Sequence, residues 1–240
     1  MHLSGLDQIY ILNVRSFEKR RIHVKKELDR FGLEAQFIFD WDISDLTGAV
    51  IKKFFRADSS LSLAQKSLAM KHITALQKII DNEQETALIL EDDVVLADNF
   101  VDGVNRSLSE RHLYPKENVI FIGCGGNFYT PNSERRLGKS LYINKRGRFA
   151  DSYILGKYTA QLRLDWLLDN KIDKPIDNQF EYIDNLLGIT MLWLEDPVVE
   201  QGSKNGLFKT QLESSWPRLI QKLKFSWEKI RRKYLYQFWR

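Results

Sequence analysis

The chain has 240 residues, of which 43% are hydrophobic and 28% charged, and its formal net charge is +4. These values are ordinary for a soluble globular protein, and the length suffices for one large domain with a substantial core. The single Cys124 excludes an intramolecular disulfide and favours a reducing compartment. No apolar stretch reaches the roughly 18 residues of a transmembrane helix, and we expect no N-terminal targeting peptide.

The positive charge is concentrated towards the C-terminus. Residues 215–240 carry a net charge of +7, which leaves −3 for residues 1–214 because the whole chain carries +4. In the same segment apolar residues recur every three to four positions, as Leu219, Leu223, Trp227, Ile230, Tyr234 and Phe238. A basic amphipathic helix is typical of attachment to an anionic membrane surface. We therefore predict a domain at 1–214 and a membrane-association tail at 215–240, with packing on the domain or a dimer contact as alternatives.

Hydrophobic periodicity predicts alternating strands and helices. A first strand at 8–14 is followed by a helix from 16 to about 31, and a second strand at 35–39 precedes a loop-rich stretch with a short helix. A strongly amphipathic helix follows at 63–80. The remaining predicted elements are strands at 87–90, 119–123, 152–155 and 191–194, a long loop at 125–148 and a helix at 159–170. This order predicts an α/β fold with a mostly parallel sheet and helices on its faces.

Three consecutive acids, Glu91, Asp92 and Asp93, end the apolar run 87–90. Burying one unpaired carboxylate is costly, and adjacent carboxylates also repel each other, so the cluster favours a bound cation. Oxygen ligands suit a hard divalent ion such as Mg²⁺ or Mn²⁺. On an extended backbone Glu91 and Asp93 would point to one side and Asp92 to the other. The alternative is a strand that stops at Leu90, followed by a solvated acidic turn.

Several segments resemble, in the expected order, glycosyltransferase family 25, whose members are bacterial lipooligosaccharide and lipopolysaccharide glycosyltransferases. The strand that ends in Glu91, Asp92 and Asp93 carries the best match. Two positions depart from the pattern, since Lys71 stands where Ser is usual and Asn178 replaces a His. The other matching segments are 9–16 with Arg20 and Arg21, 37–42, 65–76 with His72, 152–154 with Ala160, 175–178 and 197–203.

The resemblance implies a GT-A-like, Rossmann-like fold and inverting transfer of a sugar, with galactose expected, from a UDP-sugar to a lipooligosaccharide, lipopolysaccharide or related surface glycan. It also implies Mn²⁺ or Mg²⁺ as cofactor. Asp93 is then the catalytic direct ligand of the metal, Glu91 orients the ribose or a metal-bound water, and Asp92 helps to bind substrate. A lipid-linked saccharide acceptor would place the protein in the cytoplasm, peripherally on the inner face of the inner membrane. No nucleic-acid partner is expected, because no known module accompanies the basic helix.

Five further residues are candidates for binding the donor. Asn13, Arg15 and Arg20 follow the first strand, where amides and guanidinium groups suit phosphate or uracil oxygens. Asp40 and Asp42 end the second strand, and their counterparts in the family lie near the base and ribose. A helix-capping or turn role for the two acids is an equal alternative.

An inverting transferase needs a base that takes the proton of the attacking acceptor hydroxyl. Asp177 is the candidate, because it matches the family's late Asp after a Pro turn; its alternative role is the N-cap of the following helix. Asp151, just before its strand, is a weaker candidate. His72 is expected to pack on its helix. The departures at Lys71 and Asn178 leave open a non-catalytic alternative, a nucleotide-sugar-binding or membrane-tethered partner protein.

Overall fold

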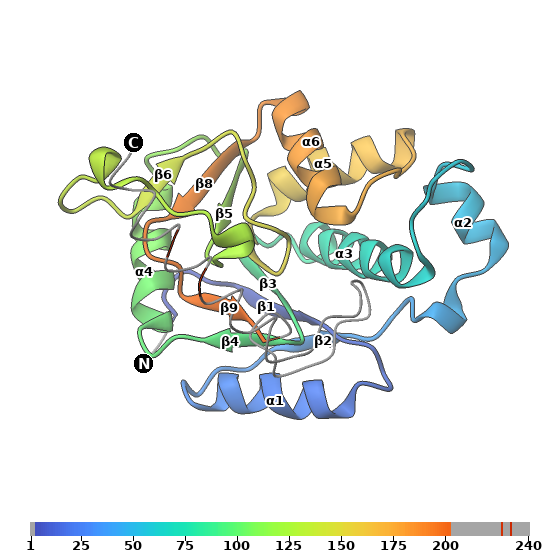
Figure 1. Cartoon of the computed structure of the whole chain (residues 1–240), viewed down its shortest axis with the longest axis horizontal. Helices are drawn as coiled ribbons and strands as arrows, with labels where there is room; N and C mark the ends of the chain where they lie inside the picture. The colour runs from blue at the N-terminus through green and yellow to red at the C-terminus, as the bar shows by residue number, and fades with distance from the viewer. Residues whose placement is uncertain (1–2, 203–226, 228–230, 232–240) are drawn as a thin grey trace.

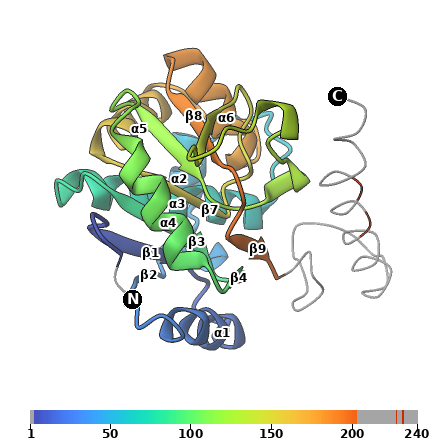
Figure 2. The same ribbon diagram turned by 90° about the vertical axis from the view of Figure 1, so that its left-hand side faces the viewer.

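The computed structural model describes residues 3–202, 227 and 231. Its main sheet has seven strands in the order β2-β1-β3-β7-β5-β8-β6. β4 (Val94–Leu96) and β9 (Val199–Gln201) pair antiparallel in a separate ribbon and lie side by side in both views (Figures 1 and 2). The strands of the main sheet are β1 (Gln8–Leu12), β2 (Gln36–Ile38), β3 (Ala87–Glu91), β5 (Asn118–Phe121), β6 (Leu141–Ile143), β7 (Ser152–Leu155) and β8 (Thr190–Leu194).

The sheet is mainly parallel, as predicted. β1 pairs in parallel with β2 and β3, and β5 pairs in parallel with β8. β7 runs antiparallel to both β3 and β5, and β6 runs antiparallel to β8 at the edge. Between β5 and β7 the chain contains no α-helix, and a parallel connection normally needs such a crossover. β7 therefore enters the sheet from the edge at which β3 and β5 end.

Helices cover both faces of the sheet (Figures 1 and 2). α1 and α4 pack on one face, and α3, α5 and α6 pack on the other. The predicted helix at 16–31 forms two residues shorter at each end, α2 is the predicted short helix, and α4 was not predicted. The helices are α1 (Glu18–Asp29), α2 (Gly48–Phe54), α3 (Leu63–Asp81), α4 (Phe100–Arg111), α5 (Lys157–Asp169) and α6 (Ile176–Leu187).

The continuous apolar runs of the central strands follow from this three-layer arrangement. In β1, Ile9 and Ile11 pack towards α1 and α4, whereas Tyr10 and Leu12 pack towards α3, α5 and α6. Successive side chains of a strand point to opposite faces, so a strand covered on both faces must be apolar at every position. Polar residues are therefore confined to the strand ends, where the site lies.

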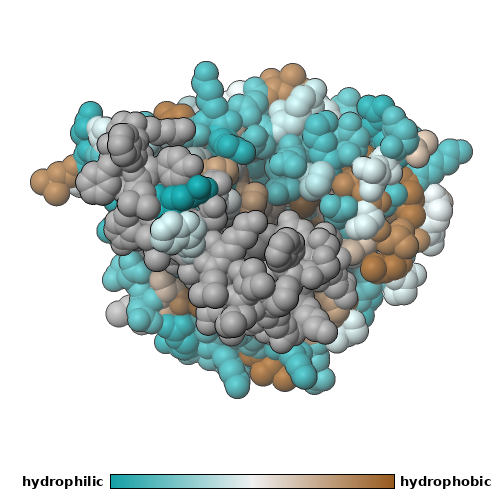
Figure 3. All heavy atoms as spheres, in the orientation of Figure 1, coloured by the Kyte–Doolittle hydropathy of each residue, from teal (hydrophilic) through white to brown (hydrophobic). Residues whose placement is uncertain are grey.

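No helix in the described part of the chain is long and apolar enough to cross a membrane. On the face seen in Figure 3 the described side chains are mostly hydrophilic, with apolar residues in small groups. Apart from Trp227 and Arg231, the predicted tail at 215–240 lies outside the described residues. The division into a domain and a tail therefore stays a prediction.

Candidate active site

The acidic side chains meet at the edge of the sheet where β3 ends and β7 begins. Glu91 is the last residue of β3, and Asp92 and Asp93 form the turn that leads into β4. Asp151 directly precedes β7, and the backbone N–H of Glu91 donates to the Asp151 carbonyl at 2.9 Å. Because β7 is antiparallel, its first residues lie beside the last residues of β3.

The turn corrects one prediction. Extended backbone ends at Glu91, so the alternation that would place Glu91 and Asp93 on one side does not apply beyond that residue. The turn is instead fixed by its neighbours, since the N–H of Gly202 donates to the Asp93 carbonyl at 2.6 Å. The fully solvated acidic turn is also excluded, because Asp92 and Asp93 are only 4% and 2% exposed.

Asn13 and Arg20 converge on Asp92. Asn13 Nδ2 donates to Asp92 Oδ2 at 2.7 Å, and Arg20 Nη1 donates to Asp92 Oδ1 at 2.9 Å. The same guanidinium lies 3.8 Å from Asp93 Oδ2. Burial raises the pKa of Asp92, while Arg20 and Asn13 oppose that rise. Two of the five residues predicted to bind the donor thus hold the acidic turn in the structure.

Glu91 and Asp151 form the centre of a group of buried carboxylates, in which Arg20 contacts Asp92 and Asp93. Removal from water raises the pKa of Glu91 well above its ordinary value, and Asp93, Asp151, Asp92 and Asp177 raise it further. Burial likewise raises the pKa of Asp151 to about 8, and the charge of Asp93 adds to the rise. Mutual repulsion among buried carboxylates is the electrostatic signature of a site that binds positive charge.

Asp151 lies over Gly123, the second residue after β5. A Cβ at Gly123 would lie 3.2 Å from both carboxylate oxygens of Asp151 and would collide with Ser152 Oγ. Glycine is therefore required for the carboxylate to occupy this place. Neither oxygen of Asp151 makes a hydrogen bond of good geometry within the described structure, although the residue is only 1% exposed.

These residues fit a hard divalent cation by their chemistry. Their donors are carboxylate oxygens, and the two buried oxygens of Asp151 make no hydrogen bond of good geometry among the described residues, which leaves them able to bind an ion or water. Among the residues that the structure describes, no three His, Cys, Asp or Glu side chains converge as a ready-formed metal site. Binding an ion would therefore require small side-chain movements at this edge.

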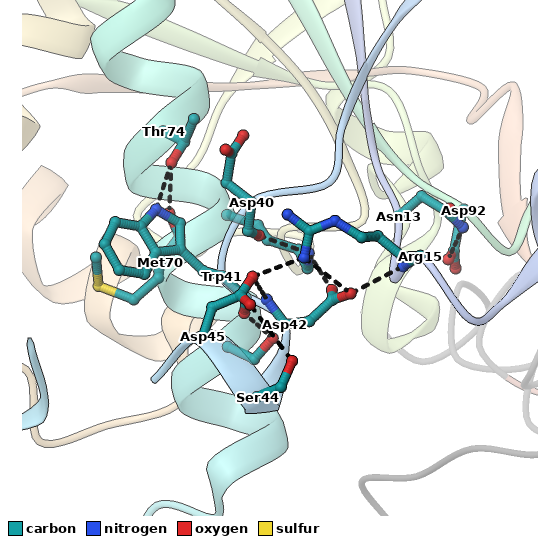
Figure 4. Close-up of polar contacts among 12 residues, drawn as sticks. Asn13, Arg15, Asp40, Trp41, Asp42, Ser44, Asp45, Met70, Thr74 and Asp92 are labelled. Atoms are coloured by element: carbon teal, nitrogen blue, oxygen red, sulfur yellow. Dashed lines mark hydrogen bonds and ion pairs between the residues drawn. The ribbon is translucent and has the colours of Figure 1, made fainter. Parts of the chain in front are cut away.

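A second polar group surrounds Arg15 at the end of β2 (Figure 4). The backbone N–H of Arg15 donates to Asp42 Oδ2 at 3.1 Å, and its Nη1 donates to Asp45 Oδ2 at 2.7 Å. Asp42 is the N-cap of a 3-10 turn at Ile43–Asp45, so the capping role considered for it is present. In Figure 4 the Asp40 carboxylate points away from Arg15, Asp42 and Asp45.

Lys71 anchors this turn from α3. Its Nζ lies 2.8 Å from Asp42 Oδ1 and donates to the Asp40 carbonyl at 2.6 Å. The Lys71 side chain is 2% exposed and that of Asp42 11% exposed, so the pair is shielded from water. The departure from the family pattern at Lys71 thus supplies a buried positive charge to the acidic turn after β2.

Asp177 lies in the first turn of α6, and Pro175 occupies the N-cap position. The alternative N-cap role of Asp177 is therefore wrong. Asp177 lies on the wall of a pocket beside the acidic edge, and its charge raises the pKa of both Glu91 and Asp151. The structure thus brings this late acid of the sequence to the same site.

His72 packs on its helix, as predicted. It is fully buried, its Nδ1 lies 2.9 Å from the Tyr153 hydroxyl, and burial lowers its pKa to about 3. Tyr153 lines the same pocket as Asp177. Sequence reasoning missed the ion pair of Arg163 with Asp184, at 2.6 Å, that lies behind this pocket. The sequence shows one charged residue within each of two helices, but it does not indicate that these two residues form an ion pair with each other.

Among solved structures, the chain is similar to three glycosyltransferases. Mouse xyloside xylosyltransferase 1 in its apo form has 12% sequence identity and a TM-score of 0.43, covering 82% of this chain and 98% of that chain. A glycosyltransferase involved in glycosylation of the major capsid of PBCV-1 has 11% identity and a TM-score of 0.42, covering 92% and 99%. The galactosyltransferase LgtC, with donor and acceptor sugar analogues, has 11% identity and a TM-score of 0.40, covering 91% and 95%.

No curated protein matches the sequence. The profile of glycosyltransferase family 25, described as LPS biosynthesis protein, matches residues 6–174. This match spans well over half of the chain and includes β1, the acidic turn after β2, and the Glu91–Asp92–Asp93 strand end. The chain therefore belongs to glycosyltransferase family 25 and is a glycosyltransferase.

Proposed function

We propose that the protein is a metal-dependent, inverting glycosyltransferase that moves galactose from UDP-galactose to a lipooligosaccharide, lipopolysaccharide or related surface glycan. The observation that carries this proposal is the group of buried carboxylates at one sheet edge, where the N–H of Glu91 donates to the Asp151 carbonyl, in a chain of glycosyltransferase family 25. Such a set binds positive charge, and a nucleoside diphosphate sugar brings a diphosphate that a cation can bridge to it. The expected location is the cytoplasmic face of the inner membrane.

Asp93 and Glu91 are the proposed ligands of Mn²⁺ or Mg²⁺, and Asp151 is added to them here. The ion, when bound, would neutralise charge that develops on the leaving nucleoside diphosphate. Asp92 is held by Asn13 and Arg20, so its proposed role is to keep the turn in place, while Arg20 limits the net negative charge of the cluster.

The donor is proposed to lie over the ends of β1 and β2. The side chain of Arg15 is 53% exposed although it pairs with Asp45, so its outer N–H groups can contact a phosphate or uracil oxygen. Asp40 and Asp42 are the proposed contacts to ribose or base. Lys71 and Arg15 balance the negative charge of the Asp42 carboxylate and so stabilise the shape of the turn.

Asp177 is the proposed base. It is partly exposed on the pocket wall and close enough to Asp151 and Glu91 to raise their pKa values. An acceptor hydroxyl in that pocket could pass its proton to Asp177 as it attacks the anomeric carbon. Asp151 is the weaker candidate for the base, because it is buried and is proposed above as a ligand of the metal.

Calorimetric titration of UDP and of several UDP-sugars, each with Mn²⁺ and with EDTA, tests the donor site. Metal-dependent binding with a preference for UDP-galactose supports the proposal, and loss of that binding in Asp93→Asn assigns the site. Asp169→Asn, an exposed acid at the end of α5, is the matched control. An absence of UDP binding under every condition contradicts the proposal. Donor binding without hydrolysis or transfer would favour the non-catalytic alternative.

A further inference from the structure

A pocket of about 440 Å³, including open solvent at its mouth, lies beside the acidic edge. Its walls come from the end of β5, the loop before β7 and the start of α6, and include Phe121, Phe149, Phe180 and Tyr153. Arg146, Arg163, Asp177, Asn178 and Glu181 also line it, so aromatic and polar side chains converge on one pocket. In the sheet order, β1 and β2, at whose ends the donor is proposed to lie, are on one side of β3, and β7 and β5, which contribute to the pocket, are on the other.

One cation is held at this pocket by an aromatic stack. The guanidinium of Arg146 lies 4.2 Å from the ring centroid of Phe128, which stacks on Trp193 at 6.0 Å and 11°. Trp193 Nε1 also donates to the Arg146 carbonyl at 2.7 Å. Side chain and backbone of Arg146 are therefore both fixed to the same pair of rings, which orients the planar guanidinium before any ligand arrives.

Two other charged groups of the wall are committed to the protein, and a third is Asp177, the proposed base. Arg163 is 0% exposed and makes a two-pronged ion pair with Asp184, and Glu181 accepts the N–H of Gly147 at 2.8 Å. The exposed guanidinium of Arg146 makes no hydrogen bond or ion pair with another residue that the structure describes. A pre-oriented guanidinium with its N–H groups facing solvent suits a carboxylate or a phosphate.

The loop that carries Arg146 also connects the pocket to the acidic edge. Phe149 has a φ of 58°, in the left-handed region that a bulky side chain rarely adopts. This backbone conformation puts Phe149 on the pocket wall, while Asp151, two residues later, lies over Gly123 at the reacting edge. Strain of this kind persists where surrounding structure enforces it, commonly at ligand sites.

We propose that this pocket binds the acceptor sugar, that the sugar carries an anionic group, either a carboxylate or a phosphate, and that Arg146 recognises that group. The assignment to the acceptor rests on the proposed function. The ring packs against the partly exposed face of Phe149, and the hydroxyl that attacks the donor faces Asp177 and the acidic edge. Recognition of the anionic group by Arg146 then determines which acceptor sugar is held beside the acidic edge.

Ligand-observed NMR titration tests this with four probes at millimolar concentration: methyl β-D-glucoside, methyl β-D-glucuronide, glucose 6-phosphate and inorganic phosphate. At least one anionic sugar should bind about tenfold more tightly than the neutral glucoside. The glucuronide and the sugar phosphate distinguish a carboxylate from a phosphate. Equal binding of neutral and anionic sugars, or no binding of either anionic sugar, overturns the proposal. Inorganic phosphate that binds as tightly as the sugar phosphate overturns the saccharide assignment.

Three variants assign the effect to the stack. Arg146→Ala should remove the preference for the anionic sugar, and Arg146→Lys should keep only part of it, because an ammonium group lacks the planar fork. Lys145→Ala, the neighbouring exposed cation, should leave the preference unchanged. A preference that survives Arg146→Ala contradicts the proposal. UDP titration of the same variants should match the native protein, so a failure of the donor site is recognised separately.

Discussion

Replacing Lys71 by Met should destabilise the protein by about 3 kcal/mol. Methionine keeps most of the apolar stem but removes the charge that pairs with Asp42 at 2.8 Å, in a pair whose side chains are 2% and 11% exposed. Removing one partner of a buried ion pair costs about 3–5 kcal/mol. The lower end applies, because Arg15 still contacts the same carboxylate, through its N–H at 3.1 Å and its guanidinium at 3.5 Å.

Urea unfolding followed by circular dichroism measures this effect, and with a slope of about 3 kcal/mol/M the midpoint should fall by about 1 M. Lys78→Met, on the same helix, is the matched control and should change stability by less than about 0.5 kcal/mol. The Lys78 side chain makes no ion pair or hydrogen bond among the described residues. The double variant with Asp42→Asn completes a thermodynamic cycle, in which we expect a coupling of at least about 1.5 kcal/mol.

Two results would refute the reasoning. A loss of stability in Lys71→Met no larger than that of Lys78→Met would mean that the buried ion pair does not hold the turn. A coupling near zero would mean that Lys71 acts through packing or through the Asp40 carbonyl instead of through Asp42. UDP titration of Lys71→Met adds a functional measure: weaker binding would connect this turn to the donor, since a side chain buried to this degree cannot touch the donor itself.

Three further predictions concern the acidic edge and the core behind the pocket. Asp93→Asn should abolish transfer with an unchanged circular dichroism spectrum, and retained activity would refute its assignment as metal ligand. Asp151→Asn should lower the transfer rate at least about 100-fold, measured by release of UDP, while Asp169→Asn should not. Burial lowers the pKa of His72 from 6.5 to about 3, so the unfolded chain binds a proton first as pH falls. Stability should therefore fall by about 2 kcal/mol between pH 6.5 and 5, and His72→Gln should remove that part of the pH dependence in urea unfolding.

The sequence predicted those strands and helices whose pattern of apolar residues is set by local burial. The runs at 87–90 and 119–123 are apolar at every position, which is what burial on both faces of a sheet requires, and both became central strands. The direction of β7 was not predictable, because the pattern of a four-residue buried strand does not show which way the strand runs. The missed helix α4 has Gly103, a poor helix former, as its fourth residue. That glycine is needed because a Cβ would collide with Val198 Cγ1.

The site was predictable in its residue types and less so in their partners. The acids of the β3 end are close together in the sequence, so their clustering required no tertiary information. Asn13 and Arg20 are 79 and 72 residues away from Asp92, and only the parallel pairing of β1 with β3 brings them together. From the sequence these two residues were candidates only for binding the donor, and their hydrogen bonds to Asp92 depend on the turn at Asp92–Asp93, which an extended-strand argument does not describe.

The antiparallel insertion of β7 is what completes the carboxylate group. In a wholly parallel sheet the residue before a strand lies at the edge opposite to the strand ends, where Asp151 would be far from Glu91. Because β7 runs the other way, its first residue pairs with the end of β3, as the register of Ser152 with Leu90 requires. The same reversal brings the Arg146–Asp151 loop to the acidic edge. One change of strand direction thus supplies both the buried acid at the acidic edge and part of the wall of the adjoining pocket. The acid and the pocket wall come from different residues of one loop. Asp151→Asn should therefore lower transfer, whereas Arg146→Ala should remove the preference for an anionic sugar.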